Sequence, residues 1–187
     1  MTRNRWFLLA LCLAALNLSA QTMLDVDLGY RWTDVSGNEA MYRTQINEDE
    51  GLLIRALTLS SPDFRLDISD AGVGPASALR FEARRDGLYR LNLRYRKTDA
   101  FSALPAFAFG QHTFDRTRDL VDADLEILRW SAIKPFIGYS WNRYEGPGTT
   151  TWHIGQDEFV LSQDLSDTDR ELRVGASFEF GPVTGQF

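Results

Sequence analysis

The fold is decided by residues 78–97, which read ALRFEARRDGLYRLNLRYRK. Apolar and polar residues alternate on both sides of Arg85-Asp86-Gly87, and side chains on a β-strand point to opposite faces with a period of two. We expect a β-hairpin with these three residues as its turn and the glycine in the left-handed conformation, because a two-residue turn would mix the faces. The pairs expected in this register are Phe81 opposite Leu91 and Glu82 opposite Arg90.

One face of this hairpin is apolar and the other is rich in charge. The charged face carries Arg80, Glu82, Arg84, Arg90, Asn92, Arg94 and Arg96. So many arginines are uncommon on one face of a soluble sandwich, but they are typical of the wet interior of a membrane β-barrel. The hairpin therefore favours an all-β, antiparallel, up-and-down transmembrane barrel, or the N-terminal part of one, with about eight strands.

The first twenty residues have the pattern of a secretory signal peptide. Arg3 and Arg5 precede an apolar run at 6–16, which is too short to span a bilayer, and Leu18-Ser19-Ala20 offers a cleavage site. A tight anchor or a buried N-terminal helix is the alternative. We therefore expect two segments, a signal peptide at 1–20 and an outer-membrane barrel domain at 21–187.

Charge and cysteine content exclude several classes of protein. The chain has 20 basic and 26 acidic side chains, and the signal segment holds two of the arginines and no acid, so the processed chain has a net charge of −8. This balance argues against a nucleic-acid partner, which requires a basic surface. The single cysteine, Cys12, lies in the signal segment, so no disulfide framework is expected.

Eight strands are expected after the signal, at 24–34, 51–60, 64–69, 78–84, 88–97, 118–129, 133–144 and 170–180. Tight turns at 61–63, 85–87, 130–132 and 181–182 alternate with longer polar links at 35–50, 70–77, 99–117 and 145–169. Bacterial outer-membrane barrels have this asymmetry, with short periplasmic turns and long external loops. The chain is therefore expected in the bacterial outer membrane.

The alternation extends to the other hairpins. The apolar face is expected to hold Leu52, Ile54, Ala56, Thr58, Phe64, Leu66 and Ile68 in the second and third strands, then Val121, Ala123, Leu125, Ile127, Ile137, Tyr139 and Trp141, and finally Leu172, Val174, Ala176, Phe178 and Phe180. The charged face is expected to include Asp122, Asp124, Glu126, Arg173 and Glu179. If the strands at 88–97 and 118–129 pair, a basic row meets an acidic row. This arrangement fits mutual neutralisation inside a filled barrel, or a charged constriction that selects solutes.

Little in the sequence indicates catalysis, so no enzyme activity is expected. Ser102, His112 and Asp115 form a triad only on paper, because any polar loop offers such a set. Asp67, Asp70 and the acidic row lack the spacing of a calcium loop, and Gly72-Val73-Gly74-Pro75 lacks the lysine and helix of a phosphate loop. No catalytic residue, metal or cofactor is expected.

Several short pieces resemble the N-terminal end of large bacterial outer-membrane barrels, in particular those that sheathe decahaem cytochromes. The pieces are Gly29-Tyr30-Arg31, Val35-Ser36-Gly37-Asn38, Met41-Tyr42-Arg43, Gly51 with 52–60, 88–96, and Phe101 with Leu104-Pro105. The resemblance implies a large barrel, with outer-membrane lipid around it and a periplasmic or lumenal partner such as a multihaem cytochrome. The chain departs from that family in lacking its paired cysteines, and it has no haem-attachment motif of its own.

Two expectations about size stay open. Members of that family are far longer and 183–187 resembles the start of another strand, which favours a fragment; eight strands and a terminal Phe187 instead suit a small closed barrel. The expected function is a channel, transport component or sheath. The alternatives are a structural anchor or adhesin that binds through external loops, and a soluble exported barrel with the apolar face around a ligand.

Overall fold

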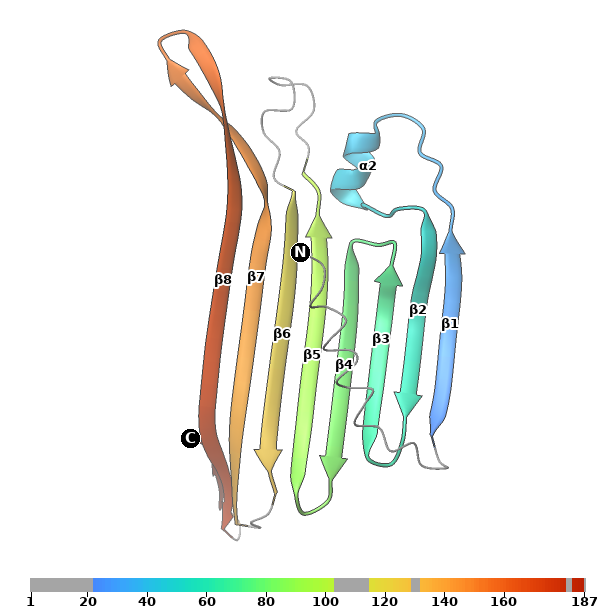
Figure 1. Cartoon of the computed structure of the whole chain (residues 1–187), viewed down its shortest axis with the longest axis vertical. Helices are drawn as coiled ribbons and strands as arrows, with labels where there is room; N and C mark the ends of the chain where they lie inside the picture. The colour runs from blue at the N-terminus through green and yellow to red at the C-terminus, as the bar shows by residue number, and fades with distance from the viewer. Residues whose placement is uncertain (1–21, 103–114, 129–131, 181–182, 187) are drawn as a thin grey trace.

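The computed structural model of the protein describes residues 22–102, 115–128, 132–180 and 183–186. Within these residues, nine strands form one antiparallel sheet in which each strand pairs with the next along the chain (Figure 1). The strands are β1 (Met23–Arg31), β2 (Gly51–Ser60), β3 (Phe64–Gly72), β4 (Ala76–Arg85), β5 (Tyr89–Ala100), β6 (Arg116–Ile127), β7 (Ile133–Ile154), β8 (Asp157–Phe180) and β9 (Val183–Gln186). The predicted all-β, up-and-down antiparallel order is confirmed, and the predicted signal segment lies outside the described residues.

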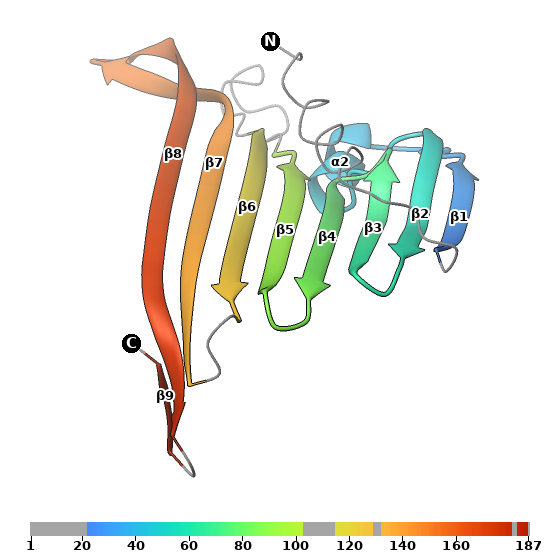
Figure 2. The ribbon, with the colours of Figure 1, turned by 60° about the horizontal axis from the view of Figure 1, so that its bottom comes forward.

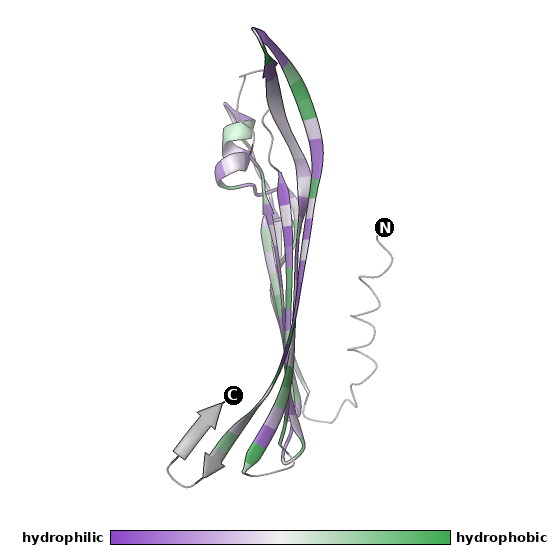
Figure 3. Cartoon of the chain, turned by 90° about the vertical axis from the view of Figure 1, so that its left-hand side faces the viewer, coloured by the Kyte–Doolittle hydropathy of each residue, from purple (hydrophilic) through white to green (hydrophobic). Residues whose placement is uncertain are grey.

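The sheet is a single layer with two margins. Figures 1 and 2 place β1 and β8 at opposite sides of the sheet, and in the described part of the chain β1 pairs only with β2. At the other margin, β9 pairs with β8 from Ser177 to Phe180. The edge view in Figure 3 shows this one twisted layer. The pairings of the described residues therefore give an open sheet.

The hairpin of β4 and β5 has the predicted three-residue turn, but the turn lies one residue further along the chain. Arg85 pairs with Tyr89, and the Leu88 N–H donates to the Arg85 carbonyl over 2.9 Å. Gly87 has a φ of +69°, which glycine adopts without steric cost. The predicted cross-strand pairs were therefore wrong, although both partners stay on their faces: Phe81 lies opposite Leu93 and Glu82 lies opposite Asn92.

A β-bulge corrects the predicted faces of β2. The β1–β2 register shifts next to Asp27, and the β2–β3 pairing omits Arg55 and Asp70, where Asp70 has a φ of +52°. An extra residue in a strand reverses the alternation beyond it. Beyond the bulge, Leu57 and Leu59 pair with Ile68 and Leu66, so the predicted placement of Ala56 and Thr58 on the apolar face was wrong.

The predicted alternation of short turns with long polar links holds only in part, because two of the predicted long links are short connections. Residues 73–75 join β3 to β4, because β3 runs to Gly72 and β4 begins at Ala76. Residues 145–169 do not form a polar loop: β7 and β8 continue as a ladder to a two-residue turn at Gly155 and Gln156. The end of the sheet that carries turns 61–63 and 86–88 keeps the short connections.

The extension of β7 and β8 forms a two-stranded arm, defined here as residues 146–165. The last pair between β6 and β7 is Thr117 with Glu145, so beyond that point β7 pairs only with β8 within the described residues. The arm rises beyond the other strands in Figure 1. At its base, the guanidinium of Arg116 donates to the Pro147 carbonyl over 2.8 Å.

The link from β1 to β2 contains the helix α2 (Glu39–Gln45). Asn38 caps the helix by accepting a hydrogen bond from the Met41 N–H over 3.2 Å, and Glu39 and Arg43 complement the helix dipole at its two ends. The Arg43 guanidinium stacks 3.9 Å from the centre of the Phe101 ring, and this contact joins the helix to the end of β5. No helix in the described ranges has the length and hydrophobicity needed to cross a bilayer.

Candidate functional site

The predicted charged residues stand in cross-strand rows on one face of the sheet, because directly opposed residues of neighbouring strands share a face. The first row is Arg80, Arg94, Asp122, Ser140 and Glu171; the second is Glu82, Asn92, Asp124, Gly138 and Arg173; the third is Arg84, Arg90, Glu126, Phe136 and Gly175. Arg96 lies one row further on, opposite Leu120. Glu179 pairs with Thr184 in the backbone register, and its side chain lies outside the described residues.

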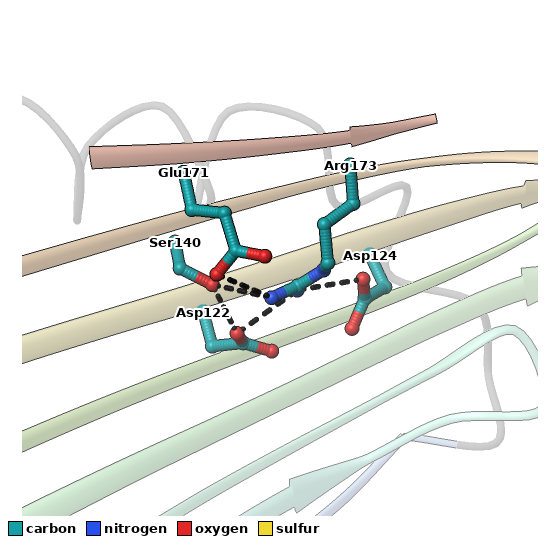
Figure 4. A network of polar contacts seen from close by, with 5 residues as sticks. All are labelled: Asp122, Asp124, Ser140, Glu171 and Arg173. Carbon is teal, nitrogen blue, oxygen red and sulfur yellow. Dashed lines mark hydrogen bonds and ion pairs between the residues drawn. The ribbon is translucent and has the colours of Figure 1, made fainter. Parts of the chain in front are cut away.

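Arg173 is the centre of a polar network on this face that includes Asp122, Asp124, Ser140 and Glu171 (Figure 4). Its guanidinium donates to the Asp122 and Asp124 carboxylates over 3.0 and 3.1 Å and to the Ser140 hydroxyl over 2.7 Å. The Ser140 hydroxyl donates in turn to Asp122 over 2.7 Å, and the Glu171 carboxylate lies 3.6 Å from the guanidinium. One cation from β8 therefore ties together β6, β7 and β8.

Gly138 makes room for this network. A Cβ atom at this position would lie 2.5 Å from Oδ1 of Asp124 and 2.9 Å from Nε of Arg173. Any larger side chain would therefore displace one of the two ionic partners. The sequence offers no signal for this role, because it depends on the register of three strands.

The basic and acidic rows of β5 and β6 do meet, since these strands pair over their whole length. Arg90 forms an ion pair with Glu126 at 3.3 Å. The carboxylates of Asp122 and Asp124 point instead to Arg173, which the sequence did not identify as their partner. Neutralisation of the acidic row therefore comes from β8 as well as from β5.

The opposite face of the sheet is apolar and open to its surroundings. Its side chains include Leu28, Leu52, Leu172 and Val174, whose exposed fractions are 67%, 75%, 66% and 72%. Only three apolar side chains in the described part of the chain are buried: Leu53, Phe64 and Ala176. Monomeric soluble proteins rarely leave so large an apolar surface uncovered.

A charged border closes the apolar face at the end that carries the arm. The residues that follow Tyr95, Val121 and Trp141 on this face are Lys97 and Asp99 on β5, Thr117 and Asp119 on β6, and Arg143 and Glu145 on β7. Lys97 pairs with Asp99 and Arg143 with Glu145, while the Tyr95 hydroxyl donates to Asp119 over 2.5 Å. This border was not predicted, although the same alternation of residues marks it.

Of Ser102, His112 and Asp115, the structure describes Ser102 and Asp115. The Ser102 backbone N–H donates to the Asp115 carboxylate over 3.1 Å, and His112 lies outside the described residues. Between α2 and the ends of β5 to β7 lies a small cleft of about 170 Å³ lined by residues that include Arg43, Asp99 and Glu145. Within the described ranges, no three His, Cys, Asp or Glu side chains are grouped so as to hold a metal ion.

Comparison of the chain with protein-family models, with curated proteins and with solved structures gives no match.

Proposed function

We propose that the protein is an outer-membrane β-barrel component whose apolar face meets lipid and whose charged face lines an aqueous interior. The single observation that carries the proposal is the open apolar face, with Leu52 and Val174 more than two-thirds exposed. A one-layer sheet has no second layer to cover such a face. Hydrocarbon is the environment in which this exposure stabilises the chain, because transfer of apolar surface out of water is favourable by about 25 cal/mol per Å².

The dimensions of the apolar face support a lipid partner. The face runs from Tyr89 to Tyr95 on β5, which is about 20 Å along the strand at about 3.4 Å per residue. On β7 it runs from Ile133 to Trp141, which is about 27 Å. Transmembrane barrels have an apolar band about 25 Å tall with aromatic residues at both borders. The charged border that follows Tyr95 and Trp141 suits the headgroup region.

The contacts of the charged face support an aqueous interior. Its carboxylates and guanidiniums bond to one another across strands, and they stay partly exposed. The soluble-barrel alternative would place the apolar face around a ligand and these ions in bulk water. A channel, a transport component or a sheath around a lumenal partner needs an apolar face toward lipid and a charged face toward water, and this sheet has both.

The proposal requires that the margins of the sheet be paired. In lipid, every backbone N–H and C=O group needs an internal partner, so only a closed sheet can span the bilayer. The outer edge of β1 therefore has to meet another strand, from this chain or from another.

Fractionation and gel mobility test the membrane placement. Full-length protein should remain with outer membranes after carbonate and high-salt washes, dissolve only in detergent, and migrate differently on gels before and after boiling. A periplasmic protein of similar size serves as the washed control. Purified chain that is soluble and monodisperse without detergent would contradict the proposal.

The arm favours a second candidate function, a membrane-anchored binding protein or adhesin. Residues 145–169 contain six carboxylates and no lysine or arginine, and Trp152, Ile154 and Phe159 are at least half exposed on the arm. Conductance in planar bilayers separates the two functions. A channel gives discrete current steps, whereas an anchor inserts without them.

A further inference from the structure

Five arginines of one hairpin share the charged face and are called the arginine strip here: Arg80, Arg84, Arg90, Arg94 and Arg96. The row of Glu82 and Asn92 separates Arg84 and Arg90 from the other three. All five side chains are exposed. The register sets Arg80 directly opposite Arg94 and Arg84 directly opposite Arg90. Like charges directly opposite each other on a sheet are destabilising, so two such pairs in one hairpin call for a compensating anion.

The described carboxylates around the strip compensate only part of this charge. Glu82 pairs with Arg80, and Glu126 pairs with Arg90. Asp122 lies opposite Arg94, but its Oδ2 atom accepts from Ser140 and Arg173 on the far side. Among the described residues, no carboxylate lies within ion-pair distance of Arg84, Arg94 or Arg96.

The surroundings of Arg94 and Arg96 leave this end of the strip the most positive. Arg96 has Ala78 and Leu120 as its cross-strand neighbours, so neither neighbour supplies a charge. Arg94 and Arg96 are two residues apart on one face, which is a distance of about 7 Å along the strand. Both guanidinium groups can therefore reach the same anion. Guanidinium groups bind carboxylate and phosphate with paired parallel hydrogen bonds, whereas a chloride ion accepts no such fork.

We propose that the arginine strip is a binding site for oxyanions, namely the phosphate or carboxylate groups of a solute, with Arg94 and Arg96 at its centre. The strip runs about 20 Å from Arg90 to Arg96, so a solute with more than one anionic group can engage both ends. Arg80 lies across from Arg94 and adds a third guanidinium. The site depends only on water reaching the charged face, and it is independent of whether the protein forms a conducting channel.

Titration with inorganic phosphate tests the site. Full-length protein in detergent micelles is labelled with ¹⁵N-arginine, and the side-chain Nε–Hε signals are followed as phosphate replaces chloride at constant ionic strength. We expect saturable shifts in the signals of the strip, and at least a tenfold loss of phosphate affinity in the R94Q/R96Q variant. Citrate, which carries several carboxylates, should bind more tightly than acetate.

Arg118→Gln is the matched control, because Arg118 is an exposed arginine on the same face whose guanidinium donates to Asn142. This variant removes one arginine charge outside the strip and should bind phosphate as the unchanged protein does. If R94Q/R96Q does not fold, R94K/R96K keeps both charges but loses the planar fork, and its affinity should fall at least threefold. Affinity within twofold of the unchanged protein in either variant, or equal competition by chloride, would overturn the proposal.

Discussion

Arg173 is the residue on which the charged face depends most. Its guanidinium serves two carboxylates and a hydroxyl from two other strands, so its loss leaves Asp122 and Asp124 close together without a cation. Hydrogen bonds to charged groups contribute about 1.5–3 kcal/mol each, and partial exposure of this network reduces that value.

We expect Arg173→Gln to lower the free energy of unfolding by about 2 kcal/mol, measured by urea titration of protein refolded into lipid vesicles. Arg118→Gln, which removes one bond to Asn142, should cost less than about 1 kcal/mol because it breaks a single exposed contact. Adding Asp122→Asn to Arg173→Gln should restore part of the loss, because the stranded carboxylate is then neutral. Equal losses for the two arginine variants would contradict a central role for Arg173.

Gly138 allows a second test of the same network. Its added methyl group meets the flexible ends of Asp124 and Arg173, so the side chains move aside and the ionic contact is broken. We expect Gly138→Ala to cost about 1 kcal/mol in the same urea titration. In the double variant with Arg173→Gln this cost should largely disappear, since the contact is already lost. If the costs of the two substitutions add, Gly138 does not act through the contact between Asp124 and Arg173.

Among the elements, the arm is the one that stands apart from the rest of the sheet. It is a ladder of nine residue pairs about 27 Å long, and within the described residues its strands pair only with each other; at its base the guanidinium of Arg116 donates to the Pro147 carbonyl. We therefore expect its stability to be local, so that β1 to β6 fold without it.

Replacement of residues 147–164 by Asn-Gly should leave the sheet folded, because this pair forms the tight turn that a two-residue hairpin needs. We expect the free energy of unfolding in vesicles to change by less than about 1 kcal/mol. A protease added outside the vesicles should no longer cut the protein in the arm. This replacement also removes Pro147, which accepts the hydrogen bond from Arg116, so the expected result includes the loss of that contact. A loss above about 3 kcal/mol would mean that the arm is part of the cooperative unit.

Comparison of the elements with their sequence explains which parts were predictable. Strand alternation and the Asp86-Gly87 turn predicted β4 and β5, because both signals are local. The bulge at Arg55 was not predictable, since a bulge depends on how two neighbouring strands pair and leaves no composition signal. The arm was missed because Gly146-Pro147-Gly148 is typical of a loop, whereas the threonines and the Gly155-Gln156 turn that follow form a hairpin. The partners of Asp122 depend on a residue 51 positions away, which only the fold brings near.

At the scale of the whole molecule, an introduced arginine is expected to destabilise the protein on the apolar face and to have little effect on the charged face. Leu172 lies on the apolar face next to Arg173, and Asn92 lies on the charged face in the same cross-strand row as Arg173. An arginine introduced at either position therefore has nearly the same depth along the strands. Only the environment of the face differs.

We expect Leu172→Arg to lower the free energy of unfolding in lipid vesicles by about 1–3 kcal/mol, because it places a charge in hydrocarbon one residue pair inside the border at Trp141. Asn92→Arg should change it by less than about 1 kcal/mol, since the new guanidinium meets Glu82 and Asp124 on either side. In water, a substitution at a residue as exposed as Leu172 would alter stability by no more than about 0.5 kcal/mol. A small effect of Leu172→Arg in vesicles would therefore mean that the apolar face does not meet lipid, whereas a large effect confined to this face assigns the bilayer as its partner.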